Sequence, residues 1–167
     1  MKKFIIILGL VFMSLPFYAQ NKAIDELFDK YAGRDGFTSV NINGGLLALA
    51  SWVEDDKDTK SMLKDLNHVR ILTMEDHSDK NVNFYNELIA NIPVKDYQEL
   101  MTVKEKGQDV KFLVKQSGGF IYELLMIVGG EDNALISITG KINPKNLAKM
   151  QGIIKSGEQH EEKQDEN

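Results

Sequence analysis

Glu123 is the side chain whose position in this sequence most invites a chemical role. It interrupts the run FIYELLMIV at residues 120–128, which is otherwise apolar on both alternating phases. Burying a carboxylate in such a run is costly unless the group is paired or protonated. One interpretation is an acid held protonated in a cleft, serving a small hydrolase or isomerase. We favour the other, a structural cross-strand pair, because no second carboxylate or histidine can be placed beside Glu123.

The neighbours of Glu123 follow from the turn that succeeds its strand. Residues 129–133, Gly-Gly-Glu-Asp-Asn, are typical of a hairpin turn. If that turn has five residues, Val128 pairs with Ala134. Glu123 then faces Thr139 and lies diagonal to Lys141.

Metal-binding and nucleophile signatures are missing from the sequence. His68, His77 and His160 have no metal-ligand spacing to one another, and there is no G-x-S-x-G elbow. The loop at residues 75–77, Glu-Asp-His, is flexible and defines no coordination geometry, and the turn at 131–133 has too few ligands for calcium. Cysteine is absent, which excludes disulfides and thiolate chemistry. We therefore expect no metal and no cofactor.

Two further patterns could bind ligands but have simpler explanations. Trp52, Tyr85, Tyr97 and Phe112 could line a groove, although their spacing is more typical of core residues. Residues 43–45, Asn-Gly-Gly, join a predicted strand to a predicted helix, a place where phosphate can bind. No nucleotide-binding fingerprint accompanies them, so we interpret Asn43 as a helix cap.

Composition predicts one soluble globular domain. The chain has 167 residues, of which 43% are hydrophobic and 27% charged. Its net charge is −5, and no basic stripe is present to neutralise phosphates. Nucleic acid is therefore excluded as a partner.

The first 19 residues have the layout of a secretory signal peptide. Lys2 and Lys3 precede an apolar segment, and Ala19 is a small residue before Gln20. The apolar run from Phe4 to Ala19 has 16 residues, short of the roughly 20 that span a bilayer. We expect cleavage near Gln20, a periplasmic or secreted protein without a membrane anchor, a single domain over 20–156, and an acidic tail over 157–167.

Alternating and helical periodicities indicate an α+β fold. A C-terminal β-meander is predicted from strands at residues 110–115, 120–128 and 134–142, with glycine-marked turns at 117–119 and 129–133. Earlier strands are predicted at 37–42, 68–74 and 97–105. Helices are predicted at 21–33, 46–53, 58–66, 79–92 and from 143 onward, with caps at Asn43, Asp58 and Asp79. In the helix at 46–53, apolar residues 46, 49, 50 and 53 share one face. We expect a mainly antiparallel sheet of five or six strands with three to five helices, mostly on one face.

The meander and its flanks resemble an exported bacterial family, the domain of unknown function 4252. The features that carry the resemblance are Gly118-Gly119, Glu123, Gly129-Gly130 and the segment from Ile138 to Leu147, together with Phe28, Tyr31 and the strand HVRILTM. The family has no established activity. The resemblance implies an exported domain of a Gram-negative envelope, without lipid anchoring because the sequence lacks cysteine.

The function expected from these observations is a non-enzymatic accessory domain that binds an envelope protein or peptide. Two alternatives remain open. One is a small hydrolase or isomerase using Glu123, and the other is a component of an envelope-stress signalling pathway. A deep pocket around Glu123 would favour the enzyme, whereas a flat apolar patch or an open sheet edge would favour binding.

Overall fold

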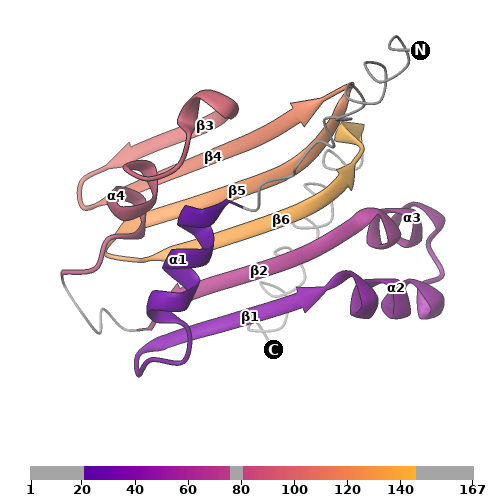
Figure 1. The fold of residues 1–167 in the computed structure, drawn as a ribbon, viewed down its shortest axis with the longest axis horizontal. Helices are drawn as coiled ribbons and strands as arrows, with labels where there is room; N and C mark the ends of the chain where they lie inside the picture. Colours follow the sequence, from indigo (N-terminus) through magenta and orange to yellow (C-terminus); the bar gives the residue numbers. More distant parts are fainter. Residues whose placement is uncertain (1–20, 76–80, 146–167) are drawn as a thin grey trace, which may run out of the picture.

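The computed structural model describes residues 21–75 and 81–145, which form one six-stranded antiparallel sheet with four α-helices (Figure 1). The strands lie in the order β1-β2-β6-β5-β4-β3. The strands are β1 (Phe37–Asn43), β2 (Leu66–Met74), β3 (Gln98–Glu105), β4 (Gln108–Ser117), β5 (Phe120–Gly130) and β6 (Ala134–Ile142). The helices are α1 (Lys22–Tyr31), α2 (Gly44–Val53), α3 (Lys57–Asp65) and α4 (Phe84–Ile89), with a 3₁₀ turn η1 (Val94–Asp96). The predicted α+β class and antiparallel sheet are confirmed.

The C-terminal meander has the predicted turns and register. β4 and β5 are joined at Gly118 and Gly119, whose φ angles of +57° and +81° are those of a tight hairpin turn. β5 and β6 pair with Val128 opposite Ala134, and Glu123 opposite Thr139. Local turn chemistry was enough to fix this part of the sheet.

The main core lies between one face of the sheet and the helices α1 and α4 (Figure 1). Leu72, Leu113, Leu125, Ile127 and Leu135 supply the sheet side, each at most 1% exposed. The helical side comes from the predicted stripes, which include Ile24, Leu27, Phe28 and Tyr31 of α1 and Phe84, Tyr85 and Leu88 of α4. Residues at alternate strand positions and at helical spacing therefore meet in one layer.

β-bulges change which face of the sheet the side chains at the start of β5 occupy. The pairing of β5 with β4 and with β6 shifts between Ile121 and Glu123. Glu123 stays on the α1 face with Leu125, but Ile121 joins Val114 and Ile142 in a second apolar cluster. Regular alternation along residues 120–128 predicts that Glu123 and Ile121 share one face. That prediction is wrong because an inserted residue reverses the alternation of side chains.

Asparagine and aspartate caps fix the helix starts, at positions that differ in part from those predicted. Asn43 caps α2 as expected, accepting from the Leu46 N–H at 3.1 Å. α3 is capped by Asp56, two residues before the predicted Asp58. α4 is capped by Asn83, and Asp79 lies outside the described residues, as does the predicted C-terminal helix beyond residue 145.

The apolar face predicted for α2 is turned to solvent. Leu47 and Ser51 contact the rest of the domain, while Leu46, Leu49, Trp52 and Val53 are exposed. Because the whole helix GGLLALASWV is uncharged, periodicity alone could not distinguish its inner side from its outer side.

Candidate functional site

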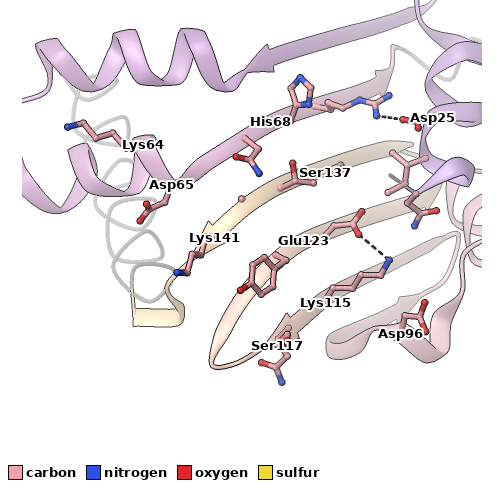
Figure 2. Close-up of a pocket in the computed structure, with 18 residues that line it drawn as sticks. Asp25, Lys64, Asp65, His68, Asp96, Lys115, Ser117, Glu123, Ser137 and Lys141 are labelled. Carbon is pink, nitrogen blue, oxygen red and sulfur yellow. Dashed lines mark hydrogen bonds and ion pairs between the residues drawn. The ribbon is translucent and has the colours of Figure 1, made fainter. Parts of the chain in front are cut away.

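A polar hollow lies on the α1 side of the sheet, between the N-terminal end of α1 and α3 (Figure 2). It has a volume of about 800 Å³. Its floor comes from β2, β6, β5 and β4. Its walls come from Ile24 and Asp25 of α1 with the preceding Asn21, and from Lys64 and Asp65 of α3. The sheet therefore carries an apolar core at one end of this face and a polar surface at the other.

The floor is polar because one row of side chains across the sheet is polar. His68 of β2 pairs with Thr139 of β6, Thr139 pairs with Glu123 of β5, and Glu123 pairs with Lys115 of β4. The next row toward the core contains Arg70, Ser137, Leu125 and Leu113. Residues on neighbouring strands in one row lie about 5 Å apart, so charged and apolar groups meet along a sharp boundary.

Glu123 is held by two partners. The Tyr97 hydroxyl donates to Glu123 Oε2 at 2.8 Å, and Lys115 Nζ lies 3.5 Å from the same oxygen. The Glu123 side chain is only 10% exposed, so this pairing offsets the cost of burying its charge. Glu123 thus forms the favoured cross-strand pair, but with Lys115 rather than with the diagonal Lys141. Lys141 instead lies over the Phe120 ring, with Nζ 4.5 Å from the centroid.

Tyr97 connects the Glu123 pair to the start of α1. Asn21 Nδ2 donates to the Tyr97 hydroxyl at 2.6 Å, and Lys115 Nζ lies 4.6 Å from the Tyr97 ring centroid. Burial, reinforced by the negative charge of Glu123, raises the pKa of Tyr97 above its ordinary value. The phenol therefore stays protonated and keeps donating to the carboxylate.

Arg70 and Asp25 form a second fixed pair beside α1. Arg70 Nη1 lies 2.5 Å from Asp25 Oδ1, and the guanidinium sits 4.0 Å from the centroid of the Phe28 ring. The Arg70 side chain is 13% exposed. A planar cation stacked on an aromatic ring and paired with a carboxylate has little freedom to move, so this wall of the hollow is rigid.

Charges in the hollow balance, although the chain as a whole is acidic. Four carboxylates line it, from Asp25, Asp65, Asp96 and Glu123, and four fixed cations, from Lys64, Arg70, Lys115 and Lys141. A site for a metal cation concentrates carboxylates, and a site for phosphate concentrates cations. This alternation of charge suits a ligand that is itself polar but carries little net charge.

His68 is the site residue that sequence reasoning overlooked. Its spacing offers no metal site, yet the pairing of β2 with β6 sets His68 opposite Thr139, in the same row as Glu123. Thr139 lies between them, and two strand spacings separate His68 from Glu123 by roughly 10 Å. The two groups cannot share a hydrogen bond directly.

The other suggested sites do not assemble. Trp52 is exposed on α2, Tyr85 is in the core, and Phe112 alternates with Leu113 and so faces the opposite side of the sheet. No ligand groove is formed by these aromatic residues. The loop at 75–77 lies mostly outside the described residues. Within residues 21–75 and 81–145 no three potential ligands lie close enough to hold a metal ion.

Comparison with known sequences gives one match. The sequence profile described as "Domain of unknown function (DUF4252)" matches residues 31–150, a segment that contains all six strands and therefore the floor of the hollow. The chain belongs to the DUF4252 family. No curated protein and no solved structure matches this DUF4252 chain. Across its described residues, no helix is long and apolar enough to cross a membrane.

Proposed function

We propose that this DUF4252 domain is an exported, non-enzymatic binding module of a Gram-negative cell envelope, and that it holds a polypeptide segment of an envelope protein in the polar hollow. The hollow between α1 and α3 carries this proposal, because it is large and its charges balance. An extended peptide presents N–H donors, C=O acceptors and occasional charges, which a surface of mixed polarity can match.

Export is supported by the first 19 residues, whose layout is that of a signal peptide. Cleavage would remove two lysines and leave 18 basic against 25 acidic residues. The chain would then be more acidic, while the charges that line the hollow would still balance. A role in envelope-stress signalling would be a special case of the same proposal, with a signalling protein as the partner.

Hydrolase or isomerase chemistry at Glu123 is the second candidate. Its position in the hollow favours it, but both of its contacts hold the carboxylate in place as a paired anion. A general acid or base needs a proton to move and a second group within reach. His68 is the one imidazole among the described residues that line the hollow, and only a substrate bridging the row could connect it to Glu123.

Ligand capture tests the proposal. The chain from Gln20 onward is immobilised and exposed to a periplasmic extract, and captured proteins are cross-linked and identified. Lys141→Glu at the hollow should reduce capture, and Lys106→Glu, an equal charge change at the exposed β3–β4 turn, should not. Equal capture by both variants would show that the hollow is not the binding site. If the captured protein is instead chemically converted, and Glu123→Gln abolishes this conversion, the enzyme is favoured.

A further inference from the structure

α2 is an apolar helix that the domain leaves largely uncovered. None of its ten residues is charged, and only Leu47 and Ser51 are buried. Leu46 is 55% exposed, Leu49 51%, Trp52 71% and Val53 84%. A helix that is hydrophobic all round is ordinarily buried. A patch of this kind on a soluble domain marks an interaction site.

The exposed side chains form one continuous stripe. Leu46, Leu49 and Val53 are spaced as neighbours on a helix face, and Trp52 lies along the side of that stripe with Gly45. An added Cβ at Gly45 would meet only Asn43 Oδ1, at 3.2 Å. The helix therefore has a large residue at its C-terminal end and a glycine, bordered by the Asn43 cap, at its N-terminal end, both on the same side.

We propose that α2 of one copy packs antiparallel against α2 of a second copy, making the chain a weak homodimer. A twofold axis at Leu49 sets the two Leu49 side chains against each other. It also brings each Trp52 to the side that carries the partner's Gly45, within one residue of its level, so a bulky side chain lies twice against a residue that has no side chain. Such self-complementarity is what an isologous interface requires.

Charge around α2 agrees with a second copy as the occupant. The segment following the helix is acidic, with Glu54, Asp55 and Asp56. In an antiparallel pair each acidic segment lies beside the N-terminus of the partner's α2, the positive end of its dipole. The same acidic residues would be repelled by an anionic bilayer, so a membrane surface fits this patch less well.

The patch exposes on the order of 500 Å² of apolar surface, at the upper end for a monomer. Stable interfaces bury about 800 Å² on each partner. Association through α2 should therefore be reversible, with a dissociation constant between about 1 µM and about 1 mM.

Sedimentation of the chain from Gln20 onward tests the proposal over about 1 µM to 1 mM, a range that brackets such a constant. Trp52 is the one tryptophan of the sequence, so its fluorescence reports directly on α2. We expect dimers at high concentration, with Trp52 emission moving to shorter wavelength along the same curve. A monomer at every concentration would overturn the proposal.

Opposite charges introduced at Leu49 in two variants make the test specific. Leu49→Lys and Leu49→Glu should each weaken dimerisation at least about tenfold, and an equimolar mixture of the two should restore it as a heterodimer. Leu100→Lys and Leu100→Glu, at an exposed leucine of the edge strand β3, are the matched controls and should leave dimerisation unchanged. Circular dichroism confirms that each variant is folded.

The remaining outcomes contradict a second copy as the occupant. A dissociation constant that is unchanged in the Leu49 variants would place the dimer interface elsewhere. A monomer whose Trp52 emission shifts only when phosphatidylethanolamine–phosphatidylglycerol vesicles are added would assign the patch to a membrane surface instead.

Discussion

Lys115 and Glu123 face each other across β4 and β5, with Lys115 Nζ 3.5 Å from Glu123 Oε2. The hydroxyl of Tyr97, the residue directly before the edge strand β3, donates to the same oxygen. This three-residue contact joins the floor of the hollow to the segment leading into β3.

Glu123→Gln should lower the free energy of unfolding by about 1–3 kcal/mol, because Lys115 loses its counter-charge in a partly buried position. Chemical denaturation measures the loss. Glu105→Gln, at an exposed carboxylate of β3, is the control and should change stability by less than about 0.5 kcal/mol. A Glu123→Gln protein that melts at or above the wild-type temperature yet loses its cellular role would show that the carboxylate is functional.

Tyr97→Phe should cost about 1–2 kcal/mol at neutral pH, since it removes the donor to Glu123 and leaves Asn21 without its acceptor. The raised pKa of Tyr97 adds a pH dependence. Above the ordinary pKa of about 10 the unfolded chain loses this phenol proton while the folded chain keeps it, so the wild type loses stability as pH rises.

The stability gap between wild type and Tyr97→Phe should therefore narrow above pH 10. Urea unfolding of both proteins at pH 7, 9 and 10.5 measures it. Tyr31, whose pKa burial also raises, is present in both proteins and cancels in the difference. A gap that stays constant across this range would contradict the assigned role of Tyr97.

Gly119→Val should destabilise the β4–β5 hairpin by about 1–2 kcal/mol. Its φ of +81° disfavours a β-branched residue, and a Cβ there would meet no atom within 4 Å. The penalty thus comes from the backbone alone. Gly118→Asn is the matched change, because asparagine tolerates the left-handed region, and thermal melting should find it close to wild type. Equal losses for both variants would point to a cause other than φ.

Gly140→Ala should be more damaging than its small size suggests. A Cβ at Gly140 would lie 2.3 Å from the Asp65 carbonyl oxygen and 2.8 Å from Leu66 Cα, both backbone atoms at the junction of α3 and β2. We expect a loss of about 2–4 kcal/mol by thermal denaturation. Gly33→Ala, which has a positive φ but open space around it, should lose less.

The sequence predicted what depends on neighbouring residues. The β5–β6 register and the pairing of Glu123 with Thr139 followed from the turn at 129–133. The hollow did not, because it needs β2 to pair with β6, and no local signal brings His68 beside Thr139. The choice of Lys115 over Lys141 depended on bulges, which leave no mark in hydrophobic periodicity. The sequence did not indicate which face of α2 is exposed, because an uncharged helix has no polar side that marks the solvent-facing surface.

The strand order has a consequence for the speed of folding. β2 is made early in the chain, yet it pairs with β6, whose residues follow it by more than sixty positions. Sheets closed by such distant pairings have high contact order and fold slowly, because a long loop must be ordered before the contact forms. The β4–β5–β6 meander can form first on its own. We expect the strand pair β1 and β2, which α2 and α3 separate in the chain, to dock onto β6 afterwards, and this docking completes the row from His68 to Lys115. In a refolding experiment, the meander and the packing of Tyr97 against it should therefore form before the protein can bind a ligand in the hollow.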